Sequence, residues 1–178
     1  GAERFFRICF TLLMALLSAI SIIVWIGCRA AGAIGTTDPT WERFFPLLEI
    51  LFPYMPLICL TALAGAALNV RRHFLTPAIA PTTLNLCWMA ALLLGASRFG
   101  IFAVAFAILV SGAIQLAMNL FTLPRYGIRV GLAWDPRHEG VGRVSRMVLP
   151  MVAGLAATQL NIVVDGLIAQ FCVPGTGA

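Results

Sequence analysis

Residues 99–124 read FGIFAVAFAILVSGAIQLAMNLFTLP, an apolar run that contains no charged side chain. A helix needs about 20 such residues to cross the roughly 30 Å of hydrocarbon in a bilayer. The apolar residues are continuous, whereas a membrane β-strand would alternate apolar and polar residues. This run therefore predicts a transmembrane helix.

Four further stretches have the same character. They are residues 8–28, 50–70, 74–97 and 147–164, the last continuing past Asp165 to residue 173. The chain of 178 residues is 61% hydrophobic and 11% charged, whereas soluble proteins are about 25% charged. We therefore expect an all-α membrane protein, a polytopic helical bundle with five transmembrane helices. Pro53 and Pro56 each remove a backbone donor, so a kink is expected in the second span.

The positions of the arginines predict how the chain crosses the membrane. All twelve basic residues are arginine, and nine of them fall in the loops of one side. The other side has only Arg29, Arg43 and Arg98. Because basic loops are retained in the cytoplasm, we expect the chain to start inside and to end outside. The cytoplasmic set includes Arg71, Arg72, Arg125, Arg129, Arg143 and Arg146. Topology accounts for the net charge of +5, and nucleic-acid binding is not expected.

Most catalytic and cofactor chemistry is not expected from this sequence. The absence of lysine excludes a Schiff base and a Walker A phosphate loop. The five cysteines are far apart and form no CxxC pair, and the only two histidines lie in arginine-rich loops. We expect a protein that is not an enzyme and has no bound organic cofactor. The chain also starts without methionine and ends directly after an apolar stretch, so we expect an internal piece of a longer protein.

The longest polar stretch, residues 125–146, separates the fourth and fifth spans. It contains five arginines and the pair Asp135-Pro136, a sequence typical of a helix start. Either a short amphipathic helix on anionic headgroups or a simple positively charged loop fits this composition.

Asp165 is the polar residue that a membrane tolerates least. It lies deep in the fifth span, where an ionised carboxylate costs about 3 kcal/mol unless it has a partner. Asn161, Thr158 and Gly154 precede it at helical intervals of four, three and four, so the oxygen-bearing side chains share one face. One hypothesis is a sodium site, or a proton site, at Asp165, Asn161 and Thr158. The alternative is a structural carboxylate near the outer interface or paired with an arginine elsewhere.

Other polar residues in the spans favour a structural role. Asn69 and Asn85 lie near the inner ends of the second and third spans, where an amide can satisfy carbonyls freed by Pro77 and Pro81. These four residues line either a substrate path or a packing seam. Gln115, Asn119 and Gln159 are expected to form hydrogen bonds between helices.

One segment carries a resemblance to a known family. Residues 53–85, PYMPLICLTALAGAALNVRRHFLTPAIAPTTLN, resemble the MurJ (MviN) family of lipid-linked cell-wall precursor flippases in the multidrug/oligosaccharidyl-lipid/polysaccharide (MOP) superfamily. The similarity lies in the initial PY, the small-residue run ending in LN, Phe74, the PA pair, Pro81 and the final Asn85. Residues 143–150, followed by Gly154 and Gln159, are similar to the family's entry into its seventh helix.

The resemblance implies helices three to seven of a fourteen-helix, two-lobe transporter. Residues 1–124 would form part of the N-terminal lobe with four helices, residues 125–146 a cytoplasmic interlobe linker, and residues 147–178 the first helix of the C-terminal lobe. The family's main substrate-contacting arginines lie on helices outside this chain. An acid on the seventh helix belongs to the sodium site of some members, and Asp165 stands at that position.

The activity implied by the resemblance is lipid II flipping for peptidoglycan synthesis. The protein would move the precursor from the inner to the outer leaflet of the bacterial cytoplasmic membrane by alternating access, without enzymatic activity. Its partners would be the lipid-linked precursor, membrane lipids and the remaining helices of the protein. Two alternatives stay open: export of another polysaccharide lipid or a drug by the same superfamily, and a non-transporting membrane scaffold for wall assembly.

Overall fold

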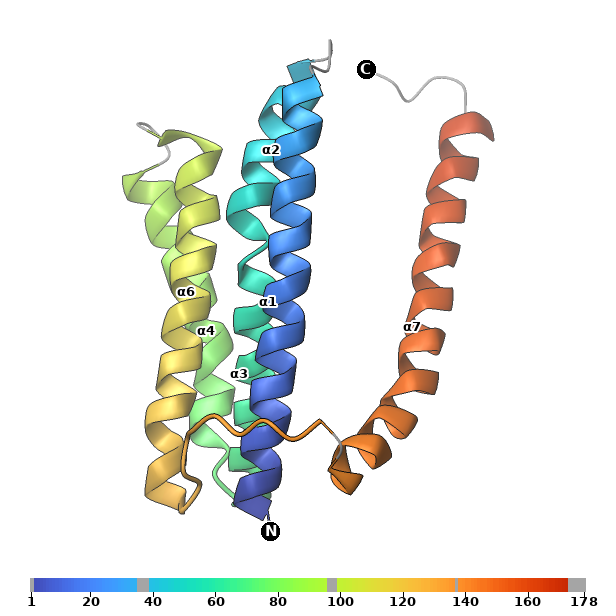
Figure 1. Cartoon of the computed structure of the whole chain (residues 1–178). Coiled ribbons are helices and arrows are strands. Elements are labelled where there is room, and N and C mark those ends of the chain that lie inside the picture. Colours follow the sequence, from blue (N-terminus) through green and yellow to red (C-terminus); the bar gives the residue numbers. More distant parts are fainter. Residues whose placement is uncertain (1, 35–38, 96–98, 137, 173–178) are drawn as a thin grey trace. The chain divides into compact units, whose positions relative to one another are not determined.

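The computed structural model describes residues 2–34, 39–95, 99–136 and 138–172, and these residues contain helices and no strands. The elements in chain order are α1 (Ala2–Ile34), α2 (Pro39–Leu51), α3 (Tyr54–Val70), α4 (Leu75–Leu94), α6 (Ile101–Thr122), the 3-10 helix η1 (Leu123–Tyr126) and α7 (Glu139–Cys172). Figure 1 shows their course. In this part of the chain, five helical segments are long and apolar enough to cross a membrane. The predicted all-α, five-span architecture is confirmed.

The second span consists of two helices joined at a proline. α2 ends at Leu51, and α3 begins at Tyr54 directly after Pro53. The Phe52 amide still donates to the Leu48 carbonyl at 2.8 Å, and the Met55 amide donates to the Phe52 carbonyl at 3.0 Å. Because proline has no amide hydrogen, it interrupts the helical ladder at this point. The predicted interruption of the second span is confirmed at Pro53, whereas Pro56 lies within the first turn of α3, where the helix continues. Pro39 begins α2, a position that proline favours because the first helical residue needs no amide hydrogen.

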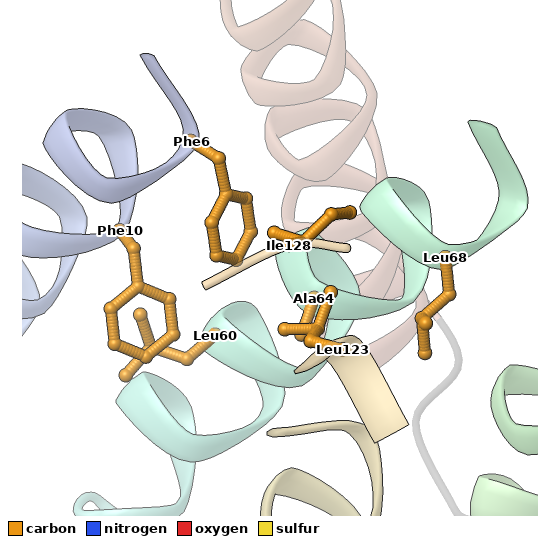
Figure 2. Close-up of a cluster of buried hydrophobic side chains, with 7 residues drawn as sticks. All are labelled: Phe6, Phe10, Leu60, Ala64, Leu68, Leu123 and Ile128. Atoms are coloured by element: carbon orange, nitrogen blue, oxygen red, sulfur yellow. The ribbon is translucent and has the colours of Figure 1, made fainter. Parts of the chain in front are cut away.

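The chain divides into two compact units, Gly1–Trp134 and Asp135–Ala178. In the first unit, α6 packs against both α3 and α4, and α1 packs against α3. A hydrophobic cluster joins α1, α3 and the segment after α6. Figure 2 shows its members, which are Phe6, Phe10, Leu60, Ala64, Leu68, Leu123 and Ile128. Because lipid tails are as apolar as these side chains, the cluster stabilises the bundle mainly through van der Waals packing.

The second unit contains α7. This helix carries Pro150 in its interior, and Figure 1 shows it bending in its first turns. A proline in a helix interior removes one hydrogen bond and bends the axis, which accounts for this shape. None of its described side chains, which end at Asp165, is buried.

Candidate functional site

The first unit gathers basic side chains at one end. The start of α1, the turn between α3 and α4, and the end of α6 all lie at this end (Figure 1). They carry Arg4, Arg7, Arg71, Arg72, Arg125 and Arg129. The last four of these residues are exposed. Arginines that are distant in sequence thus lie at one end of the first unit. Their positions in the loops of one side predict this arrangement.

The remaining arginines are distributed differently. Arg143 and Arg146 are exposed on the early turns of α7, in the second unit. Arg29, near the far end of α1, pairs with Glu49 at 3.4 Å and lies 5.0 Å from the ring centroid of Trp25. Arg98 and Arg137 lie outside the described residues.

The turn that carries Arg71 and Arg72 is fixed to the end of α6. Arg72 adopts a left-handed conformation with φ of 59°, which is uncommon for a residue other than glycine. The next residue, His73, is hydrogen-bonded through Nε2 to the Thr76 hydroxyl at 2.7 Å. Its ring also stacks on Tyr126, with 4.4 Å between the centroids. These contacts give the two exposed guanidinium groups a rigid support.

The stretch between the fourth and fifth spans is not a separate surface helix. η1 ends at Tyr126 and α7 begins at Glu139, and the described residues between them are not helical. Its first part instead returns to α1. The Arg7 guanidinium donates to the Leu132 carbonyl at 3.0 Å, and the Ala133 amide donates to the Thr11 hydroxyl at 3.0 Å. Within residues 125–146, the chain is therefore non-helical from 127 to 136, whereas residues 139–146 are helical and form the first turns of α7.

The three candidate ion ligands lie on one uninterrupted helix. Thr158, Asn161 and Asp165 belong to α7, and all three side chains are exposed. Their spacing places them on one face. The Thr158 hydroxyl donates to the Gly154 carbonyl at 3.1 Å, so its oxygen lone pairs remain available to a cation. Within the described residues, no cluster of three or more His, Cys, Asp or Glu side chains is suited to a metal.

The two asparagines and two prolines singled out in the second and third spans occupy different surroundings. Asn69 lies at the end of α3, but Asn85 lies in the middle of α4 and not near its end, so the expected position of Asn85 is wrong. Asn69 and Asn85 are exposed, and the Asn85 side-chain oxygen accepts a hydrogen bond from Trp88 Nε1 at 3.2 Å. Pro81 lies inside α4 and is exposed. Pro77, in the first turn of α4, packs against Gly65 of α3, since a Cβ atom added at Gly65 would lie 3.4 Å from the proline Cβ. Pro77 thus takes part in close helix packing.

A buried polar seam lies on α6, which packs against both α3 and α4. Ser111, Gln115 and Asn119 are spaced four residues apart and are almost completely buried. Two of them bond to their own helix: the Ser111 hydroxyl donates to the Ile108 carbonyl at 2.7 Å, and Asn119 Nδ2 donates to the Gln115 carbonyl at 3.0 Å. Among the described residues, the hydrogen bond that Asn119 donates is therefore within its own helix and not between helices as expected. Gln159 is exposed on α7.

Three polar atoms of this region have no partner among the described residues. They are Gln115 Nε2, Asn119 Oδ1 and Thr61 Oγ1 of α3. Ser111 and Thr61 were not predicted as polar members of this region. The four-residue spacing of Ser111, Gln115 and Asn119 is the signal that would have identified the stripe on α6.

Replacing Gln115 with methionine is expected to leave stability unchanged or to raise it. Methionine has nearly the same shape, and it removes an amide nitrogen that is buried without an acceptor, a state that costs about 1–3 kcal/mol. The measurement is the melting temperature of the purified protein in detergent. Asn119→Ala is the comparison variant, because truncating this completely buried side chain leaves a cavity and is expected to destabilise. A clear fall in the melting temperature of Gln115→Met would mean that the Gln115 amide has a partner.

Comparisons with known proteins agree with this architecture. A family model described as "Lipid II flippase MurJ" matches residues 1–178. A lipid II flippase MurJ of Burkholderia cenocepacia is 29% identical over 165 residues, covering 88% of this chain and 32% of that protein. A probable lipid II flippase MurJ of Rhizobium tropici is 31% identical over 183 residues, covering 96% and 34%. A third, from Haemophilus influenzae, is 26% identical over 175 residues, covering 90% and 34%. The chain spans about a third of the length of these curated relatives.

Proposed function

Since the chain belongs to the lipid II flippase family MurJ, whose model matches all 178 residues, we propose that it forms part of a flippase for lipid II. The proposed activity moves this lipid-linked peptidoglycan precursor from the inner to the outer leaflet of the bacterial cytoplasmic membrane. The match over the whole chain is the observation that carries the proposal. The five apolar helices support it, because they make the chain a multi-pass membrane protein.

The two compact units support a two-lobe organisation. We propose that the first unit, with four spans, is part of the N-terminal lobe, and that α7 is the first helix of the C-terminal lobe. The boundary between the units falls at Trp134 and Asp135, within the proposed linker at residues 125–146. Two-lobe transporters commonly alternate access by rocking one bundle against the other. The helix break at Pro53 and the bend in the first turns of α7 suit such motion.

The arginine-bearing end supports a cytoplasmic location for the start of the chain. Basic residues beside membrane spans are retained on the cytoplasmic side, and the arginines of α1, the α3–α4 turn and the end of α6 gather there. The proposed partners at this end are the anionic precursor and membrane lipids. We further propose that transport involves no covalent chemistry by this chain and that sodium or a proton couples through Asp165, Asn161 and Thr158.

Translocation of labelled lipid II by the full-length protein in proteoliposomes tests the proposed activity. We expect the protein to increase the fraction of precursor that reaches the opposite leaflet, as measured with a membrane-impermeant reagent that modifies the headgroup. Protein-free vesicles are the control. Transport of another polysaccharide lipid or of a drug, without lipid II, would support the superfamily alternative. A folded protein that moves none of these cargoes would favour the scaffold alternative.

A further inference from the structure

Residues 128–134, here called the strap, are a non-helical segment held at both ends. The strap follows η1 after Gly127, which has φ of 75° and turns the chain away from the helix. At its start, Ile128 is 6% exposed and belongs to the hydrophobic cluster (Figure 2). At its far end, hydrogen bonds from Arg7 and to Thr11 hold the backbone of Leu132 and Ala133 on α1.

From residue 130 to residue 134, the side chains of the strap alternate between two environments. Val130, Leu132 and Trp134 are 41%, 62% and 68% exposed. Gly131 and Ala133, between them, are half-buried. A Cβ atom at Gly131 would lie 2.9 Å from Arg7 Nε, so the backbone approaches the guanidinium closely. An alternation of period two gives an extended segment two faces, and here the outward face is apolar.

The outward face lies beside exposed positive charge. Arg125 and Arg129 are exposed in and next to the strap, and residues 121–134 contain no acidic residue. The strap is also only a few residues from the end of the membrane-spanning helix α6, so it cannot lie far from the membrane boundary. Tryptophan and apolar residues flanked by arginines are the composition of segments that dock on an anionic membrane surface.

We propose that the strap lies in the membrane interface and binds anionic phospholipid headgroups. Val130, Leu132 and Trp134 insert between the headgroups, and Arg125 and Arg129 contact the phosphates. The anchoring of the backbone by Arg7 and Thr11 fixes which face of the strap points toward the lipid. The partner is lipid because the apolar face and two exposed arginines occur together on a segment that directly follows a membrane span.

Site-specific fluorescence in the full-length protein tests this proposal. Single cysteines at 132, 133 and 134 in a cysteine-free background carry an environment-sensitive NBD label, and the protein is placed in nanodiscs of phosphatidylcholine with phosphatidylglycerol. We expect blue-shifted emission and strong quenching by lipid-attached nitroxides at 132 and 134, and weaker quenching at 133. In nanodiscs without phosphatidylglycerol, or in an Arg125→Gln/Arg129→Gln background, the quenching at 132 and 134 should fall.

Three results would overturn the proposal. Equal quenching at 132, 133 and 134 would mean that the strap has no lipid-facing side. Preferential quenching at 134 by aqueous iodide would place this face in water. Protection of 134 from both quenchers would mean that another part of the protein covers it. The label at 133 faces α1, so this variant is the one that could fail to fold. In that case the test is the quenching of the label at 132, compared between the protein with Arg125 and Arg129 and the double-arginine variant.

Discussion

Replacing Gly112 with leucine is expected to destabilise the first unit strongly. Gly112 is buried on α6, where the helix meets the start of α3. A Cβ atom at this position would lie 2.7 Å from Tyr54 Cδ2 and 3.4 Å from Leu57 Cβ. The Tyr54 ring would have to swing away, and Leu57 Cβ moves only with the backbone of α3. Overpacking of this kind costs about 1–3 kcal/mol, sometimes more.

The measurement is the melting temperature and the yield of monodisperse full-length protein in detergent. Gly112→Ala is expected to give a smaller decrease, since it adds the Cβ clash alone. Gly154→Ala on α7 is the matched control, because nothing lies within 4 Å of a Cβ atom added there. If Gly112→Leu and Gly154→Ala had the same melting temperature, α3 and α6 would not pack as closely as the structure shows.

The five spans were predictable because a helix that crosses a bilayer needs a long run of apolar residues. A stretch of about 20 apolar residues satisfies its backbone internally only as a helix, so the predicted and observed spans agree without any knowledge of packing. The break at Pro53 was predictable for a similarly local reason, since the missing amide hydrogen acts where the proline stands. Both features depend on residues close together in the chain.

The strap and the burial of the polar seam depend on contacts between distant residues, which a local sequence pattern does not predict. The bonds of Arg7 to Leu132 and of Ala133 to Thr11 join residues more than 120 positions apart. The loop composition therefore fitted a surface helix equally well, although the chain forms an extended strap. Likewise, the spacing of Ser111, Gln115 and Asn119 defines a face of α6, but only packing against the neighbouring helices determines that this face is buried.

The face formed by Thr158, Asn161 and Asp165 was predictable because one helix contains all three residues. Their spacing alone sets their common direction. The remaining ligands of a cation could not be predicted. They would be oxygen atoms from other segments of the chain, and helical periodicity carries no information about those segments. The role of this face is accordingly a proposal that needs a functional measurement.

Replacing Asp165 with asparagine is expected to abolish the sodium response of the full-length protein. Asparagine keeps the shape and one carbonyl oxygen but removes the charge that attracts a cation. An ionised carboxylate within a membrane span costs about 3 kcal/mol unless it is partnered, so the variant should fold at least as well as the wild type. Lipid II transport in sodium is expected to fall about tenfold or more, which corresponds to about 1.4 kcal/mol of lost coupling.

Two readouts separate this ion role from a structural one. Because a ligand that binds only the folded state raises its stability, wild-type protein should melt at a higher temperature in sodium than in choline, and Asp165→Asn should lose this difference. Gln159→Ala is the matched control, since Gln159 is exposed on another face of the same helix, and it should keep both the shift and the transport. Thr158→Val should weaken the sodium shift without abolishing it, because it removes one neutral oxygen.

If Asp165→Asn retained the sodium-dependent melting shift and normal transport, the carboxylate would be structural, and the lipid II flippase proposal would stand without an ion site on α7.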